Sequence, residues 1–109
     1  MKLSDIRDAL LQVLPDVFHY EAKGKKNKYI VWAEDNEADA GYGDNKKTTQ
    51  VIQGTIDYYT KEEYDHNVKL IQEKLNSIEV AWRLNSIQYE KDTKFIHYEW
   101  VFEFIGELI

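Results

Sequence analysis

The chain has 109 residues, of which 43% are hydrophobic and 14% aromatic, and its 20 acidic and 14 basic residues give a formal net charge of −6 at pH 7. This length suits one folded domain, so we treat residues 1–109 as a single unit. The acidic balance argues against sequence-specific nucleic-acid binding, because a phosphate backbone repels negative charge. The absence of cysteine excludes disulfides and thiolate metal ligands, and a reducing cytoplasm fits.

The N-terminal segment argues against export, and the shortness of the apolar runs argues against a membrane partner. Asp5, Arg7 and Asp8 interrupt the apolar residues that a signal peptide would need. No stretch approaches the roughly 18 consecutive apolar residues of a membrane-spanning helix.

The first third of the chain predicts a helix, a short strand and a long loop. Ser4 is a suitable N-cap, and apolar residues recur at helical spacing until Pro15 ends the pattern: Leu3, Ile6, Leu10 and Leu14. Residues 23–27 form a polar turn, and residues 28–33 (KYIVWA) are rich in strand-forming residues. Residues 34–45 (EDNEADAGYGDN) show no periodicity, which predicts an acidic loop.

Residues 49–65 (TQVIQGTIDYYTKEEYD) predict a strand that leads directly into a capped helix. Side chains alternate along the strand, as a half-buried strand requires, with Ile52, Gly54, Ile56 and Tyr58 on one face. Thr60 and Glu63 have the spacing of a capping box. The helix would then carry one apolar stripe, formed by Tyr64, Val68, Ile71 and Leu75.

The C-terminal third predicts a β-hairpin. A strand from residue 78 to Tyr89, with an irregularity near Asn85 and Ser86, is followed by a polar turn at residues 90–94 and a strand from residue 96. The aromatic residues on the apolar face of this hairpin are predicted to lie in the core: Trp82, Tyr98, Trp100 and Phe102.

The order α-β-β-α-β-β predicts a two-layer α+β fold with a four-stranded, mainly antiparallel sheet and both helices on one face. The opposite face of that sheet would be polar. Its ionisable candidate residues are Asp57, Arg83, His97 and Glu99, among which Arg83 and Glu99 are placed to pair across strands.

The acidic loop is the first candidate for a metal site or an assembly contact, through Glu34, Asp35, Glu37, Asp39 and Asp44. Its register fails as a calcium loop, because Ala40 and Lys46 replace the required Gly and Glu. A solvated loop and weak divalent binding both stay open.

No pattern of catalytic residues or metal ligands stands out in the chain. The three histidines lack ligand spacing, no serine lies in a G-x-S-x-G sequence, and there is no phosphate-binding glycine motif. The sequence does not test for a catalytic pair of carboxylates, because the fold sets the distance between them. We predict no catalytic residue, no cofactor and no metal, and therefore no enzyme.

The tyrosine excess predicts that some tyrosines lie at an interface, the candidates being Tyr58, Tyr59, Tyr64 and Tyr89.

The order and spacing of these segments resemble the tail-terminator and tail-completion proteins of long-tailed bacteriophages. The segments that carry the resemblance are an N-terminal helix, KYIVWAE at residues 28–34, a polar loop, QVIQGTIDYYTKEEYD at residues 50–65, an amphipathic helix, VAWRL at residues 80–84 and IHYEWVFEF at residues 96–104. The resemblance implies a structural protein without catalytic residues. It also implies a hexameric ring at the head-proximal end of the tail in the virion, assembled in the cytoplasm of the bacterial host.

Such a ring would dock on the tail-tube protein, stop tube growth and offer a surface to the head connector. The acidic loop and the polar sheet face would then meet neighbouring subunits or line a channel for DNA. Two alternatives stay open: another neck or minor capsid component of the phage, and a monomeric α+β ligand-binding module or small enzyme in which Asp57, Arg83 and His97 form a cleft.

Overall fold

The computed structural model describes residues 1–43 and 46–109, with side chains described for residues 1–38 and 50–109. Two helices and five strands follow one another in these described residues. Their bounds are α1 Leu3–Leu11, β1 Val17–His19, β2 Lys28–Gly43, β3 Lys46–Thr60, α2 His66–Asn76, β4 Ala81–Tyr89 and β5 Ile96–Ile105.

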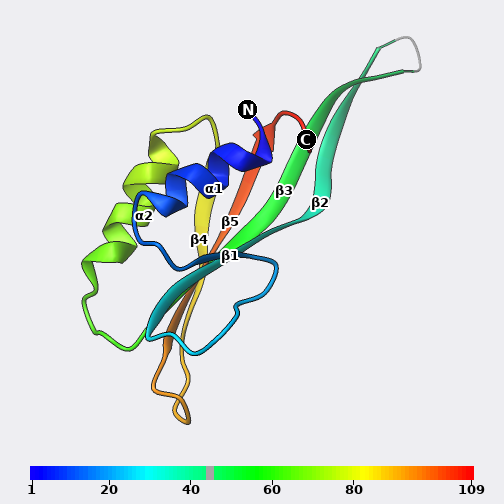
Figure 1. Ribbon diagram of the computed structural model, residues 1–109. Helices are drawn as coiled ribbons and strands as arrows, with labels where there is room; N and C mark the ends of the chain where they lie inside the picture. Colours follow the sequence, from blue (N-terminus) through cyan, green and yellow to red (C-terminus); the bar gives the residue numbers. More distant parts are fainter. Residues whose placement is uncertain (44–45) are drawn as a thin grey trace.

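The strands form one mixed sheet in the order β1-β2-β3-β5-β4, and both helices cover the same face of it (Figure 1). β1 runs parallel to β2, and the other neighbouring strands are antiparallel. The α+β class is confirmed, whereas the expected four strands are five. The missed strand, β1, has only three residues and too short a pattern to show alternation. Neither helix in the described residues is long and apolar enough to cross a membrane.

The predicted acidic loop is wrong for residues 34–43, which continue strand β2. They pair with β3 from Glu34, opposite Gly54, to Gly43, opposite Lys46. Three shifts of register interrupt this pairing. Each bulge breaks the alternation of side chains, so the strand had no readable period in the sequence. Residues 44–45 lie outside the described residues.

The end of the β2–β3 hairpin projects beyond the rest of the sheet (Figure 1). We call residues 40–43 and 46–49 the arm. Pairing between β3 and β5 ends at Val51, opposite Ile105, and β1 reaches no further along β2 than Trp32. The molecule is therefore elongated, with extents of 53 × 25 × 24 Å and a radius of gyration of 15.1 Å. A compact chain of this length would have a radius of about 13 Å.

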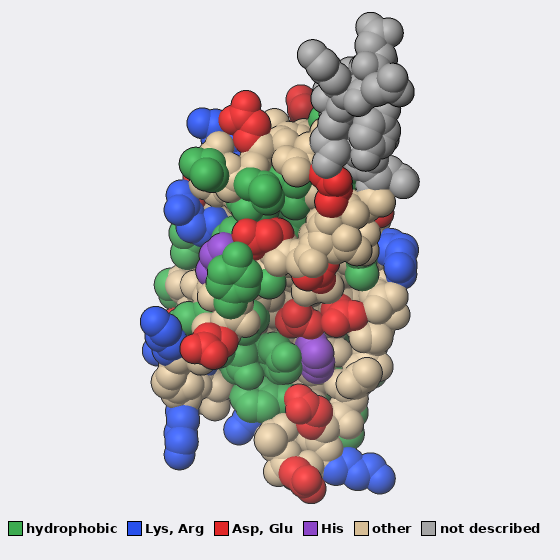
Figure 2. Space-filling model, turned by 90° about the vertical axis from the view of Figure 1, so that its right-hand side faces the viewer, with side chains coloured by type: hydrophobic (Ala, Val, Ile, Leu, Met, Phe, Trp, Pro, Cys, Tyr) green, Lys and Arg blue, Asp and Glu red, His purple; other side chains and the backbone are tan. Residues whose placement is uncertain are grey.

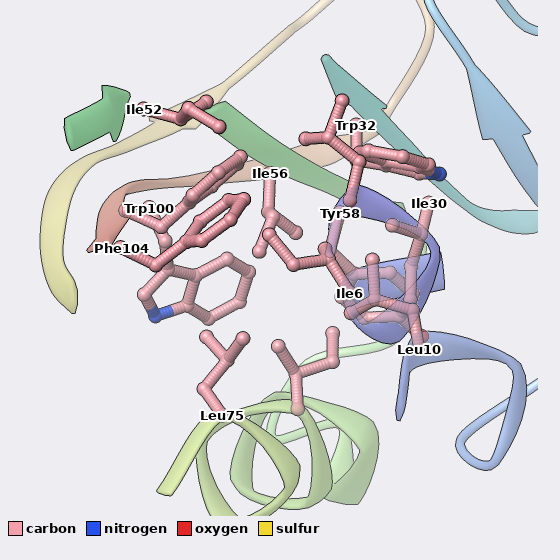
Figure 3. Packing of buried hydrophobic residues seen from close by; sticks show 13 residues of the cluster. Ile6, Leu10, Ile30, Trp32, Ile52, Ile56, Tyr58, Leu75, Trp100 and Phe104 are labelled. Carbon is pink, nitrogen blue, oxygen red and sulfur yellow. The ribbon is translucent and has the colours of Figure 1, made fainter. Parts of the chain in front are cut away.

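The hydrophobic core lies between the sheet and the two helices (Figure 3). Ile6 and Leu10 of α1 and Leu75 of α2 meet strand residues that are fully or almost fully buried: Ile30, Trp32, Ile52, Ile56, Tyr58, Trp100, Phe102 and Phe104. The core positions predicted for Trp100 and Phe102 are confirmed, and Trp82 and Tyr98 pack against the core while partly buried.

Gly54 is required because the backbone of β2 and the Phe102 ring of β5 leave no room for a side chain at this position of β3. A Cβ atom at Gly54 would lie 2.2 Å from the Ala33 carbonyl oxygen and 2.5 Å from the Phe102 ring. The aromatic ring therefore fills the space that a side chain at this position would take, between Ile52 and Ile56 on the same face of β3.

Both helix starts differ from the sequence prediction. α1 begins at Leu3, and the backbone N–H of Lys2 donates to the Asp5 carboxylate at 2.8 Å, so Ser4 is not the cap. α2 begins after Asp65, whose carboxylate accepts from the Asn67 backbone N–H at 2.9 Å. The proposed Thr60–Glu63 capping box is wrong. Tyr64, which has a φ of 56°, lies outside the helix and is 97% exposed.

Asp65 joins the end of β3 to the start of α2 through a buried set of hydrogen bonds. The hydroxyls of Tyr58 and Thr60 donate to its carboxylate at 2.5 and 2.7 Å, and the Lys28 ammonium lies 3.4 Å away. Burial alone would raise the pKa of Asp65, but these donors and the Lys28 charge hold it below its usual value. Burial, together with the bond to Asp65, raises the pKa of Tyr58 to about 12.

Replacing Trp100 with alanine should destabilise the protein by about 3–5 kcal/mol, because the indole is fully buried and its loss leaves a cavity. Urea denaturation measures the change in free energy of unfolding. The matched control is Tyr64→Ala, which removes a 97% exposed ring and should change stability by no more than about 0.5 kcal/mol. Equal effects of the two substitutions would contradict the described core.

Replacing Asp65 with asparagine should cost about 1–3 kcal/mol at pH 7, since a buried charged acceptor loses its charge-assisted bonds. Because the folded pKa of Asp65 is depressed, its stabilisation is present above the unfolded pKa near 3.8 and is lost as the pH falls through the folded pKa. Urea denaturation at several pH values should therefore show the difference between the two proteins narrowing in acid. A constant difference would contradict this assignment.

Candidate functional site on the outer face of the sheet

The face of the sheet opposite the helices, here called the outer face, carries the predicted polar residues, as the strand registers show. Side chains alternate between the two faces of the sheet along β3 and β5, so those that do not point toward the helices lie on the outer face. Asp57 and Glu99 lie directly opposite each other in the ladder, and His97 is opposite Tyr59. Acidic and hydrophobic side chains adjoin each other across the face in Figure 2.

His97 and Asp57 form a well-enclosed ion pair on the outer face. Nε2 of His97 lies 2.6 Å from Oδ1 of Asp57, and the two side chains are only 18% and 17% exposed. The bond to Asp57 raises the pKa of His97, although burial partly opposes this shift. The carboxylate of Asp57 thus holds the imidazole in one orientation.

Arg83 and Glu99 are connected through Asn85 rather than by the direct pair that the sequence suggested. Nη1 of Arg83 donates to the Asn85 side-chain oxygen at 2.7 Å, and the Asn85 amide donates to Glu99 at 2.7 Å. Asn85 is the extra residue of the irregularity between Leu84 and Ser86, which the sequence did predict. A bulge commonly redirects a side chain in this way.

An aromatic ladder that the sequence analysis missed adjoins His97. Tyr29 stacks on Tyr59 with centroids 4.7 Å apart, and Tyr59 stacks on His97 at 4.3 Å. Phe95 meets Tyr29 and Tyr59 edge to face, at 5.8 and 6.2 Å. Tyr29, Tyr59 and His97 come from β2, β3 and β5, and Phe95 directly precedes β5, so only the strand register brings these residues together. The one sequence feature that could have indicated the ladder is Tyr29, because the alternation of side chains along β2 places it on the outer face.

Beside this ladder the surface is hollowed over about 550 Å³. We call this feature the aromatic hollow. It lies between the segment that follows β1 and the turn between β4 and β5, and its lining combines rings, carboxylates and amide groups: Tyr20, Glu21, Ala22, Tyr29, Val31, Tyr59, Gln88, Glu90, Thr93, Phe95 and His97.

The acidic residues predicted as a loop site are not brought together where the structure describes them. Glu34 pairs with His19 at 2.6 Å, and Glu37 accepts from Gln50 at 2.9 Å. Asp35 is exposed. The side chain of Asp39 and all of Asp44 lie outside the described part of the chain. Among the residues that are described, no three His, Asp or Glu side chains are grouped to hold a metal ion.

The outer face is equipped for binding, with fixed carboxylates, an oriented imidazole and aromatic rings. No protein-family model matches the chain, and no curated protein is significantly similar to it.

The His97 imidazole should titrate above the ordinary histidine value of 6.5, and Asp57→Asn should lower that pKa, because the charged partner is lost. Proton NMR of the ring protons measures both. Because the folded pKa is raised, the pair contributes stability that is full below pH 6.5 and disappears as the pH rises through the folded pKa. His97→Gln should therefore cost more stability at pH 6 than at pH 9, whereas His66→Gln serves as the control in α2.

Proposed function

We propose that this protein is a structural subunit of a long-tailed bacteriophage or prophage, a tail terminator or tail-completion protein rather than an enzyme. In this proposal, copies of the chain form a ring, most simply a hexamer, at the head-proximal end of the tail. The ring ends growth of the tail tube and joins the tail to the head connector. The resemblance of the sequence segments supports this assignment, and two structural features, the arm and the free edge of β4, support the assembly role.

The observation that carries the assembly role is the arm. Its two strands pair only with each other among the described residues, since β5 ends at Ile105 and β1 pairs no further than Trp32. An isolated two-stranded ribbon is marginally stable in water. A neighbouring subunit that packs on the arm would stabilise it.

A second feature that favours assembly is the free edge of β4. This strand ends the sheet, and in the described structure it pairs only with β5. Leu84, Ile87 and Tyr89 on this strand are 39%, 57% and 57% exposed. An unpaired edge that also exposes large apolar side chains favours contact with another chain. Tyr89 thus fits the interface role expected for some tyrosines, whereas Tyr58 is fully buried and does not.

The acidic balance is consistent with a ring through which DNA passes. The net charge is −6, and Asp57, Glu99 and Glu103 all lie on the outer face. Negative charge along a channel would keep the phosphate backbone from adhering to the wall.

Removing the arm should abolish assembly and leave the domain folded. In the test variant, residues 40–49 are replaced by Asn-Gly, a dipeptide that closes a two-residue hairpin. Mass photometry and light scattering over a wide concentration range should show oligomers, most simply hexamers, for the unaltered protein and monomers for the variant. The core lies outside the deleted segment, so thermal unfolding should remain cooperative.

Negative-stain microscopy of the unaltered protein should then show rings. In a phage that lacks its own terminator gene, the unaltered chain should restore tails of normal length joined to heads, and the arm variant should not. A strictly monomeric unaltered protein would contradict the ring. If the protein forms rings that fail to restore tails, the oligomer would be confirmed and the tail-terminator role would be excluded.

A monomeric ligand-binding module is the second candidate, and the aromatic hollow is the observation that favours it. Hollows that combine rings with a few polar groups are typical of ligand sites. The mass measurement separates the two candidates, because a binding module would remain monomeric with and without the arm.

A further inference from the structure

The second half of β4 is a regular strand edge that lacks protecting residues. After the register shift between Leu84 and Ser86, residues 86–89 (SIQY) pair with β5 without a break. Natural edge strands are commonly protected by lysine, proline, inward-pointing charge or a bulge, and residues 86–89 contain none of these. The turn end of the β4–β5 hairpin also extends beyond both helices (Figure 1). This half of β4 is therefore accessible to another strand.

Ile87 and Tyr89 are the residues of this half whose backbone groups face away from β5. The N–H of Glu90 donates to the Phe95 carbonyl across the hairpin at 2.8 Å. Hydrogen-bonded and non-hydrogen-bonded pairs alternate in an antiparallel ladder, so Gln88 bonds to β5, whereas Ile87 and Tyr89 direct their N–H and C=O groups to the free edge. Both side chains are 57% exposed. These two residues thus offer hydrogen bonds and apolar surface to an added strand.

The arm has a matching edge on its β2 strand. Residues 40–43 (AGYG) are uncharged, and in the described structure they pair only with β3, because β1 reaches no further than Trp32. The other strand of the arm begins with Lys46 and Lys47, and the extra residue of its register shift, Thr48, follows them. Lysines and a bulge protect a strand edge, so the β2 edge of the arm is the one open to pairing.

We propose that residues 40–43 of one copy add as a strand to residues 86–89 of the next copy, so that each arm continues the sheet of its neighbour. This inference rests on the proposed ring and names the two surfaces that meet in it. Both segments are uncharged, so they can meet without opposing like charges, although each copy has a net charge of −6.

The contact joins two different surfaces of the chain, and it is therefore head-to-tail. A head-to-tail contact gives a closed ring where the rotation between copies closes. Main-chain hydrogen bonds supply the affinity when a strand is added to a sheet edge. Here the backbone groups of Ile87 and Tyr89 would form those bonds, and their exposed side chains would lie beside the added strand.

Hydrogen exchange of individual backbone amides tests this pairing in the unaltered protein. On assembly, the amides of Ile87 and Tyr89 should exchange at least about tenfold more slowly than in the arm variant, because each gains an acceptor. The Gln88 amide is the internal control, since it already bonds to β5 and should change much less. If the protein assembles while Ile87 and Tyr89 still exchange as fast as in the arm variant, the edge pairing is overturned and the ring is kept. An unaltered protein without oligomers would contradict the ring itself, and this inference with it.

Two substitutions of Ile87 separate backbone pairing from side-chain packing. Ile87→Pro removes an N–H that β5 does not use, and proline is tolerated at such positions of edge strands. It should weaken assembly at least about tenfold, whereas Ile87→Thr, which keeps the N–H and suits a strand, should weaken it less than about threefold. Cooperative thermal unfolding shows that each variant is folded. Equal losses in the two variants would overturn strand addition.

The head-to-tail arrangement also predicts that two defective variants complement each other. The Ile87→Pro variant keeps its arm, and the arm variant, in which residues 40–49 are replaced by Asn-Gly, keeps its β4 edge. Each should be monomeric alone, and an equimolar mixture at high protein concentration should contain one-to-one pairs in analytical ultracentrifugation. Dimers of the arm variant alone would mean that β4 pairs with β4, and dimers of the Ile87→Pro variant alone would mean that arms pair with arms. Either result, or a mixture without pairs, would overturn the proposal.

Discussion

The alternation of side chains along β3 is the constraint on which the rest of this structure depends. β3 lies in the middle of the sheet, so one of its faces must be apolar to meet the helices. Ile52, Ile56 and Tyr58 satisfy this requirement and are buried. The same period places Asp57 and Tyr59 on the outer face. The core, the ion pair with His97 and the aromatic ladder are therefore all consequences of one register.

The end of β3 also sets the position of α2, through the buried carboxylate of Asp65. A buried carboxylate is costly unless donors surround it, and Tyr58, Thr60 and Asn67 provide them. A helix stripe was visible in the sequence, and Ile71 and Leu75 are buried as that stripe requires. The first residue of α2 could not be read from the sequence, because Thr60 and Asp65 are both suitable N-caps. The hydrogen bond from the Tyr58 hydroxyl to Asp65 favours Asp65 as the cap.

The arm and the outer face are two separate features of the chain. The arm is the end of the β2–β3 hairpin, beyond the last residues that pair with β1 and β5. The outer face carries the His97–Asp57 ion pair and the aromatic ladder, which lie over the middle of the sheet. Variants of the arm and variants of the outer face therefore alter different parts of the chain, and their effects can be measured separately.

The sequence by itself determined the α+β class, the alternating strands, the core position of Trp100 and the polar character of the outer face, because each follows from a local period. Only the tertiary structure decided how β2 continues through residues 34–43, since bulges erase that period while pairing with β3 satisfies the backbone. It also decided the aromatic ladder. Tyr29, Tyr59 and His97 are far apart in the chain, and register across three strands, which no local pattern specifies, makes them neighbours.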